Sequence, residues 1–398
     1  MGAPTARLLQ ERGHRVVVLA RGSARGGGAG GARPEQARGC EMLACDRGHS
    51  ASFVEALSGE GRPRVVVDFT AMLPRHFWPA QWGPSILMCQ PTPALIGRTS
   101  LVHQEGIETG RFSRGGPWEA IFVRHFASVT DKHCFDTGLG VRNCFGDAVL
   151  KHIADVVEVH RRRPLEHYIF ISTNMVYPGG VEDMDITSLP QPVAEGAANL
   201  SAAHAAPDTY GGRKLKCEAA LQRARAEQGL RWTVLRPPAV VGPGCDSRHE
   251  RLQRLVAGLP PLPARASKRP PTVRPGRFRV AYSGDVAEAV AAVVELGERV
   301  HGEAFNIACP ASMTLGEYVG GIASCLGLCT QEVPDDPALR NYERQGEVDV
   351  SKSLRVLGIE GTPVQRWMRQ TVSWHARALA EAPASWSKII SRARDTLV

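Results

Sequence analysis

Short amphipathic segments alternate with continuous apolar runs along much of the chain. The first unit, ARLLQERGHRVVVLARG, places a helix-like segment and a Gly-His turn before an apolar run at 16–19. The second, GHSASFVEALSGEGRPRVVVDFTAM, ends in a run at 65–69, and the third, GDAVLKHIADVVEVHRRRPLEHYIFIST, in a run at 168–171. A fourth unit passes from Tyr210 through a helix to RWTVLRPP. Apolar runs without polar alternation are typical of strands that are buried on both faces of a parallel sheet.

Buried strands that alternate with helices predict a doubly wound, Rossmann-like α/β fold with a parallel sheet. We assign residues 1–72 and 146–240 to this domain, and residues 241–398 mainly to a smaller substrate-binding domain with segments that return to the first. Residues 73–145 show no sustained strand or helix period, and a loop of this length is unusual inside a compact domain. We interpret them as a loosely packed insertion or as translated non-coding sequence that is not native to the fold, and favour the second.

The composition indicates a globular protein outside the membrane. Of the 398 residues 43% are apolar, which is enough for one large or two medium cores. We find no run of about 18 apolar residues and no signal-peptide layout, so we expect no membrane contact and a cytoplasmic location, with organellar import left open because the amino terminus is not certain to be complete. The ten cysteines are scattered without a paired Cys-x-x-Cys or Cys/His set, which predicts reduced thiols and no metal site.

The positive charge has two readings. A net charge of +8 favours phosphate-bearing ligands or nucleic acid without demonstrating either. The densest basic stretch, residues 264–279, is rich in proline and is either a solvated loop or a clamp for a substrate phosphate, which makes Arg277 a candidate substrate ligand. The glycine run at 22–39 comes after the first helix, whereas a phosphate-binding loop leads into it, so we interpret the run as a flexible loop.

The strongest candidate for chemistry is the pair Tyr210 and Lys214. A spacing of four puts both side chains on one helix face, with Cβ atoms about 5–6 Å apart. An ammonium at that distance favours the phenolate, lowering the tyrosine pKa from about 10 toward that of a general acid/base. Taken alone, the pair is equally consistent with an amphipathic helix surface.

Thr173 and the segment 237–240 follow two buried strands, and the carboxyl ends of parallel strands gather at one edge.

Four ordered motifs carry a family resemblance. They are STNMVY at 172–177, YGGRK at 210–214, LRPPAVVGP at 235–243 and VAYSGDVAEAVAAVVE, with Asp285 in an acidic position before a helix. Together they resemble the extended short-chain dehydrogenase/reductase family, in particular its NAD-dependent sugar epimerase/dehydratase branch. The resemblance covers most of residues 2–72 and 146–375, whereas 73–145 have no counterpart. Asp285 is expected to contact the hinge or to cap its helix.

The resemblance implies a role for each catalytic candidate. Thr173 would hydrogen-bond the substrate hydroxyl, Tyr210 would remove its proton as a hydride moves to the nicotinamide, and Lys214 would hold the ribose hydroxyls and keep Tyr210 acidic. Thr173 is otherwise a strand-end threonine that satisfies the backbone, and Ser172 is expected to be structural. The family's dehydratases carry Asp-Glu where this chain has Asn174 and Met175, which disfavours dehydration. Epimerisation or reduction of a nucleotide-sugar or similar polyol remains, with Asn174 as a candidate substrate ligand.

The resemblance also implies where the cofactor would bind. It places the third glycine of the family's G-x-x-G-x-x-G turn on Gly2, so that the first strand and two glycines would lie before Met1. That strand is central in the family's sheet, and its loss would expose neighbouring strand edges. Either a longer protein carries the complete turn, or this chain is a weakened or inactive form.

Other cofactor contacts are expected along the chain. Ala20 lacks the acid of NAD-preferring relatives and Arg21 suits a 2′-phosphate, so we favour NADP over NAD. The remaining cofactor candidates are Asp46 on the adenine side, Phe69 and Ala71 under the cofactor, and Pro237 and Val240 after a later strand. We expect a small-molecule substrate, leave a homodimer open, and regard nucleic acid as the alternative, in which a degenerate family member acts as a nucleic-acid-binding or scaffold protein.

Overall fold

The computed structural model describes residues 2–20, 40–44, 50–59, 65–68, 153–177, 186, 189–206, 209–243, 253, 256, 276–329 and 342–380. Structural statements below concern these residues. The segment 73–145, which the sequence sets apart, lies outside them.

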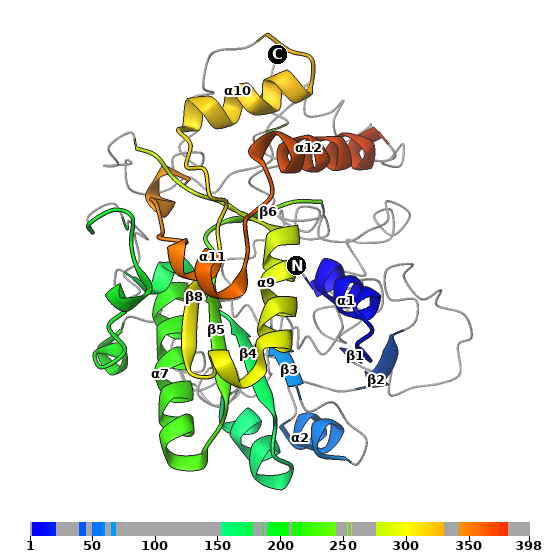
Figure 1. Ribbon diagram of the computed structural model, residues 1–398, viewed down its shortest axis with the longest axis vertical. Coiled ribbons are helices and arrows are strands. Elements are labelled where there is room, and N and C mark those ends of the chain that lie inside the picture. Colours follow the sequence, from blue (N-terminus) through cyan, green and yellow to red (C-terminus); the bar gives the residue numbers. More distant parts are fainter. Residues whose placement is uncertain are drawn as a thin grey trace, which may run out of the picture.

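A parallel four-stranded sheet forms the centre of the protein (Figure 1). Its strands are β3 (Val65–Asp68), β4 (His167–Ile171), β5 (Trp232–Arg236) and β8 (Glu303–Asn306), in the order β3-β4-β5-β8. Every residue of β4 and β5 is buried. The apolar runs of the sequence are therefore buried parallel strands, as predicted, with bounds that differ by one residue at either end.

Helices cover both faces of this sheet, and the strand pleat explains how. Val66, Phe170 and Val234 belong to one core cluster, and their chain neighbours Val67, Ile169 and Leu235 to another. Successive strand residues point to opposite faces, so each strand feeds both cores. The first cluster takes in α2 (Ser50–Ser58), the helix at 153–162 and α7 (Tyr210–Gln228); the second takes in α1 (Gly2–Glu11) and α9 (Ser283–Leu296). This confirms the doubly wound α/β fold.

Two further strands, β1 (Val17–Ala20) and β2 (Glu41–Ala44), form a separate parallel sheet. Among the described residues no strand bridges β1 and β3, although Val17 and Val66 share one core cluster. The pattern predicts one sheet, whereas β1 and β2 pair with each other apart from the central four strands, and β1 shares a core cluster with them.

The C-terminal part has an aromatic core of its own. Tyr318 lies at the centre, with ring centroids 5.9 Å from Phe278, 5.2 Å from Tyr342 and 6.1 Å from Trp367. This core joins β6 (Val240–Val241) and β7 (Ala281–Tyr282) to α10 (Leu315–Cys325) and α12 (Val364–Ala380). The short 3-10 helices are η7 (Asn174–Val176), η9 (Glu195–Ala197), η10 (Ala203–Ala205), η11 (Gly297–Val300) and η13 (Glu343–Gln345).

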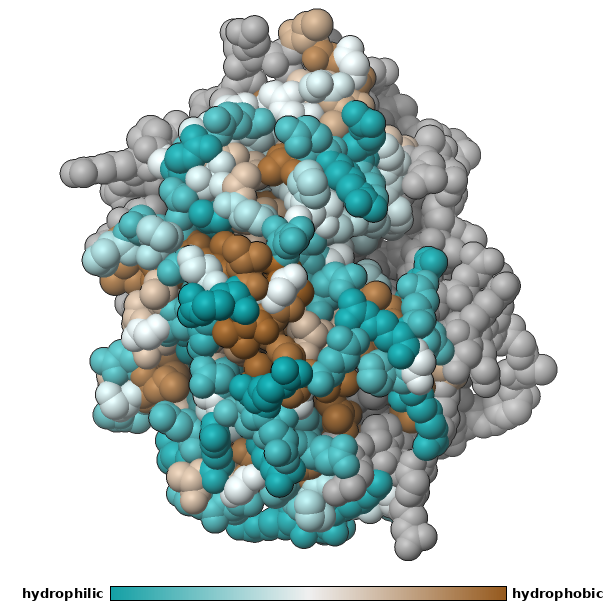
Figure 2. All heavy atoms as spheres, viewed as in Figure 1, coloured by the Kyte–Doolittle hydropathy of each residue, from teal (hydrophilic) through white to brown (hydrophobic). Residues whose placement is uncertain are grey.

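Helix α11 (Ser351–Leu357) returns to the central sheet, where it packs on α9 and β8. On the face shown in Figure 2, apolar side chains gather around this helix, and its Leu354 and Val356 are exposed. The return agrees with a C-terminal region that re-enters the first domain, while the domain boundaries themselves stay predictions. Within the described ranges, none of the helices combines the length and the apolar character that a bilayer span requires.

A buried histidine lies at the amino end of β4, opposite the strand ends that carry the catalytic candidates. His167 Nε2 pairs with Thr233 Oγ1 at 2.8 Å, and its ring lies edge-on to His301. Burial, with a smaller effect of His301, lowers the pKa of His167 to about 3. The unfolded chain, with a pKa of about 6.5, takes up this proton first as the pH falls. The stabilising effect of the neutral ring is therefore present above about pH 6.5 and is lost as the pH falls toward the folded pKa.

We expect His167→Gln to flatten the acid dependence of stability, because the variant no longer gains this proton on unfolding. Between about pH 6 and pH 4, the free energy of unfolding of the wild type should fall more steeply than that of the variant by about 1 kcal/mol per pH unit. Urea unfolding at several pH values measures both slopes. His204→Gln, at an exposed histidine, is the matched control. Equal slopes for wild type and His167→Gln would contradict the assignment.

Candidate active site

Thr173 follows the carboxyl end of β4 and caps η7. Its Oγ1 accepts a hydrogen bond from the Met175 N–H at 3.3 Å, and its hydroxyl makes a long contact of 3.5 Å with Asn174 Oδ1. The hydroxyl thus satisfies backbone, as one of the two sequence readings expects. A hydroxyl has two acceptor sites and one donor. Capping uses an acceptor site, whereas the single donor is directed at Asn174 Oδ1 over the long distance of 3.5 Å, so a substrate oxygen would replace Asn174 Oδ1 as its partner.

Tyr210 is the first residue of α7, and the sequence around it explains why the helix starts close to η7. Thr209 caps the helix by accepting from the Gly212 N–H at 3.0 Å. A Cβ placed on Gly211 would overlap the carbonyl oxygen of Met175. Glycine at 211 therefore allows the first turn of α7 to lie against η7, which brings Tyr210 to the strand end that carries Thr173.

Lys214 lies one turn further along the same face of α7. Its Nζ donates to the Ile171 carbonyl oxygen at 2.7 Å, and it lies 4.3 Å from the ring centroid of Phe170 and 6.0 Å from that of Tyr210. The side chain is buried, and burial lowers the pKa of the amine, whereas Cys217, Asp68 and Glu218 raise it. The structure thus places the two members of the predicted pair together; their catalytic roles stay predictions.

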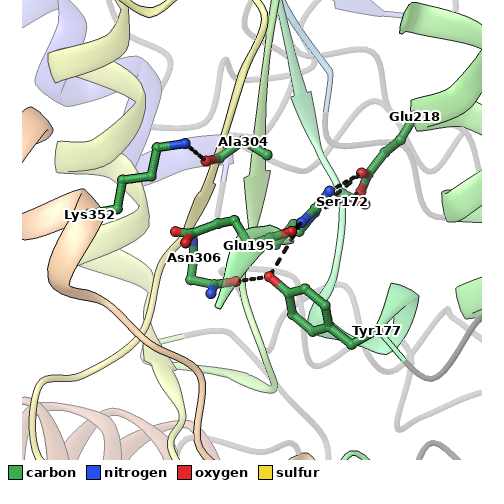
Figure 3. A network of polar contacts seen from close by, with 8 residues as sticks. Ser172, Tyr177, Glu195, Glu218, Ala304, Asn306 and Lys352 are labelled. Carbon is green, nitrogen blue, oxygen red and sulfur yellow. Dashed lines mark hydrogen bonds and ion pairs between the residues drawn. The ribbon is translucent and has the colours of Figure 1, made fainter. Parts of the chain in front are cut away.

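A buried polar network joins the next turn of α7, which carries Glu218, to the strand ends (Figure 3). Ser172 donates its hydroxyl hydrogen to Glu218 Oε1, and Arg236 Nη2 pairs with Glu218 Oε2 at 2.6 Å. Arg236 Nη1 also donates to the Glu195 carbonyl oxygen at 2.8 Å. The Tyr177 hydroxyl donates to Asn306 Oδ1 and so links η7 to β8. The network ties α7 to the carboxyl ends of β4, β5 and β8, and it gives Ser172 the structural role expected for it.

Two groups of the network, Tyr177 and Arg236, have shifted pKa values. Burial is the main cause that raises the pKa of the Tyr177 phenol above its ordinary range, although Arg236 opposes it. Burial lowers the pKa of Arg236, but Glu218 and Tyr177 together raise it overall. Tyr177 is consequently a protonated donor and not a candidate base. Sequence reasoning did not single out Tyr177, Glu218, Arg236 or Asn306. Only Glu218 had a local signal, since it continues the spacing of four from Tyr210 and Lys214.

Four other candidates lie close to these strand ends or at a helix start. Asn174 is buried, and its Nδ2 donates to the Gln345 carbonyl oxygen at 3.1 Å, so that it links η7 to η13. The Pro237 carbonyl oxygen accepts from the Asn174 N–H at 3.2 Å, and Val240 is half-buried in β6. Gly2 is the first residue of α1. The binding roles of these residues stay predictions.

Arg277 is not brought into the network. It is exposed, its Nε donates to Ser312 Oγ at 3.0 Å, and it pairs with Glu317 at 3.2 Å near the start of α10. Its role as a substrate ligand stays a prediction. Four cofactor candidates, Arg21, Asp46, Phe69 and Ala71, lie outside the described residues.

Asp285 does not cap α9 through its side chain. It accepts from the Thr362 N–H at 3.0 Å and from the Thr362 hydroxyl at 2.6 Å. Burial raises the pKa of this carboxyl, and the bonds to Thr362 oppose the effect. Asp285 therefore tethers the segment before α12 to α9 instead of forming the expected cap, and the expected contact with the hinge stays a prediction.

Within the part of the chain that the structure describes, no group of three or more His, Cys, Asp and Glu side chains could hold a metal ion. The described cysteines form no disulfide.

Comparisons with known proteins are consistent with this geometry. Residues 142–308, which include Thr173, Tyr210, Lys214 and the buried network, match the NAD dependent epimerase/dehydratase family. None of the curated proteins compared with the chain matches it.

Several solved structures share the fold. The UDP-glucose 4-epimerase of Thermus thermophilus, in complex with NAD, is 18% identical, with 94% of this chain and 95% of that chain covered and a TM-score of 0.55. The Thermotoga maritima UDP-glucose 4-epimerase with UDP-glucose is 17% identical, with 95% and 96% covered and a TM-score of 0.51. The Bordetella bronchiseptica enzyme WbmH in complex with NAD+ is 16% identical, with 94% of each chain covered and a TM-score of 0.51. Identities this low establish the shared fold alone.

We expect Gly211→Ala to destabilise the protein by about 1–3 kcal/mol, because the added methyl group forces α7 away from η7. Gly320→Ala in α10 is the matched control, since a Cβ there meets nothing within 4 Å. Alanine is the better helix former, so the control should gain about 0.5–1 kcal/mol. Thermal and urea unfolding compare the two. A Gly211→Ala variant as stable as the control would show that the close approach of α7 and η7 is wrong.

Proposed function

We propose that the chain is an NAD(P)-dependent epimerase or reductase acting on a nucleotide-sugar or similar polyol, because residues 142–308 match the NAD dependent epimerase/dehydratase family. One observation carries the proposal: the Lys214 amine lies 6.0 Å from the Tyr210 ring centroid, beside the strand end that bears Thr173. Two of the enzymes that share the fold are named as UDP-glucose 4-epimerases. A nucleotide-linked hexose is accordingly the first substrate class to test.

The described residues suit the nicotinamide end of such a cofactor. An ammonium carries three N–H donors, and Lys214 directs one of them to the Ile171 carbonyl oxygen. Donors of this kind fit the hydroxyls of a ribose. When bound, the cofactor supplies the acceptor for a hydride. Two of the solved structures that share the fold are complexes with NAD.

In the proposed mechanism each side chain acts on the proton of the substrate hydroxyl. Thr173 donates its hydroxyl hydrogen to the substrate oxygen and so orients it. Tyr210 accepts the proton that leaves this oxygen as the hydride departs from the adjoining carbon. The positive charge of Lys214 favours the phenolate form of Tyr210 that this step requires. In a reduction the same proton returns from Tyr210 to the new hydroxyl.

The residues after Thr173 favour epimerisation or reduction over dehydration. Loss of water from a sugar requires an additional acid and base, and Asn174 and Met175 supply neither. The Asn174 amide is in addition engaged with the Gln345 carbonyl oxygen. The nucleic-acid alternative has less support, because Arg277 and Arg279 of the basic stretch pair with Glu317 and Glu347. Arginines already paired with carboxylates offer less charge to phosphates.

We expect Tyr210→Phe to lower turnover by about 10²–10⁴-fold while cofactor affinity changes by less than about threefold, because the variant loses only the proton acceptor. Titration with NADH and NADPH measures affinity, and NMR of UDP-glucose follows conversion to its 4-epimer. Tyr282→Phe, which removes a hydroxyl bonded to Gln370, is the matched control and should keep activity. Wild-type protein that binds neither cofactor, or a fully active Tyr210→Phe variant, would contradict the proposal.

We propose NADP as the preferred cofactor, from Ala20 at the end of β1 and Arg21 after it. Ala20→Asp places a carboxylate where it repels a 2′-phosphate and can accept from ribose hydroxyls. The ratio of NADPH to NADH dissociation constants should then shift toward NADH by about tenfold or more. Fluorescence titration of both cofactors measures it. An unchanged ratio would place Ala20 outside the cofactor site.

A further inference from the structure

Three polar side chains follow one another at a spacing of four on α7: Tyr210, Lys214 and Glu218. This spacing stacks them on one helix face. Lys214 donates to the carbonyl oxygen of Ile171, and Glu218 accepts from the hydroxyl of the next residue, Ser172. The face that carries the proposed catalytic pair is thus bonded at two successive levels to the end of β4.

The Glu218 carboxylate is held from two sides. Ser172 bonds to Oε1, while Arg236 donates from Nη2 at 2.6 Å and from Nε at 3.2 Å to both oxygens. The side chains of Glu218 and Arg236 are 1% and 3% exposed. A forked arginine contact fixes a carboxylate in plane and direction, and a buried, satisfied polar network rigidifies its surroundings. The Ser172 hydroxyl is consequently held in one place relative to α7.

We propose that Glu218 is a positioning residue: by holding Ser172 it fixes the adjoining Thr173 relative to Tyr210 and Lys214 on the same helix. The reaction that benefits is the one proposed above, and the inference rests on it for its catalytic consequence. The contacts of Glu218 with Ser172 and Arg236 lie within the chain and form without a bound ligand. Small displacements of reacting groups lower rates strongly, so a fixed distance between Thr173 and Tyr210 has direct value for turnover.

The charge of Glu218 has a second effect, on Lys214. The groups that act on this buried amine are Cys217, Asp68 and Glu218, all of which oppose the lowering of its pKa by burial. Arg236, a cation, balances Glu218 from β5. If the charge at 218 is removed, the pKa of Lys214 falls further, and the amine becomes neutral at a lower pH. The alkaline limb of the pH–rate profile should then move to lower pH.

A role in stability alone explains the Glu218–Arg236 pair less well than a positioning role does. A buried ion pair often contributes no more than apolar residues of the same size would. Here the carboxylate also binds the residue next to Thr173 and lies one turn from Lys214. A purely structural pair would not alter the pH dependence of turnover. The pH profile therefore separates the two roles.

The mildest test is Ser172→Ala, which leaves the Glu218–Arg236 pair intact. In the full-length chain with its cofactor and UDP-glucose as probe, kcat should fall by about tenfold to a hundredfold with KM changed by less than about threefold. Ser353→Ala, which deletes a buried hydroxyl bonded to the Val350 carbonyl oxygen in α11, is the matched control and should keep kcat. Equal kcat values for the two variants would overturn the proposal.

The second test uses Glu218→Gln and Glu218→Asp. The glutamine variant should move the alkaline limb of kcat to lower pH, and the aspartate variant, which keeps the charge, should restore the limb without restoring the full kcat. NMR titration of lysine 13Cε, assigned through Lys214→Met, reads the same change without substrate. A wild type inactive on every sugar nucleotide would refute the proposed function, whereas an unshifted Lys214 titration in Glu218→Gln would refute this proposal. If Glu218→Gln does not fold, Ser172→Ala decides.

Discussion

The buried ion pair between Glu218 and Arg236 is the interaction on which the arrangement of the site depends. It joins α7 to β5, and through Ser172 it also joins both to the end of β4. Removing one member of such a pair leaves an uncompensated buried charge, at a cost of about 3–5 kcal/mol. The three elements therefore keep one relative position, and the groups at their ends keep one geometry.

One residue in each of the first three turns of α7 determines how the helix packs at the site. Gly211 lets the first turn lie against η7, Lys214 in the second turn reaches the Ile171 carbonyl oxygen, and Glu218 anchors the third. Environment then separates residues of one type. Tyr177 is buried beside Asn306 and keeps its proton, whereas Tyr210 lies beside an ammonium that favours the phenolate. Tyr177 links η7 to β8, and Tyr210 is the proposed proton acceptor.

Local pattern predicted the buried strands, the doubly wound architecture and the proximity of Tyr210 and Lys214, because each depends on residues close together in the sequence. The local pattern did not predict contacts between distant segments, which are those of Asn174 with Gln345, Asp285 with Thr362, and Arg277 with Glu317. Tertiary packing decides these partners, and no spacing encodes them. The separation of β1 and β2 from the central sheet was not predicted for the same reason, since strand pairing is set by register and neighbours. Glu218 differs from these residues, because it lies one turn beyond Lys214 at the same spacing of four and is therefore indicated by the local pattern.

The central claim is that the charge of Lys214 enables Tyr210 to accept a proton as a hydride leaves the substrate. Single-turnover reduction of the nicotinamide, followed by absorbance after mixing the chain with oxidised cofactor and UDP-glucose, tests it most directly. Lys214→Met keeps an unbranched side chain that is shorter by one atom and removes its charge. The account predicts reduction by the wild type and a rate lower by at least about a hundredfold in the variant, at saturating cofactor. Equal rates in the two proteins would contradict it.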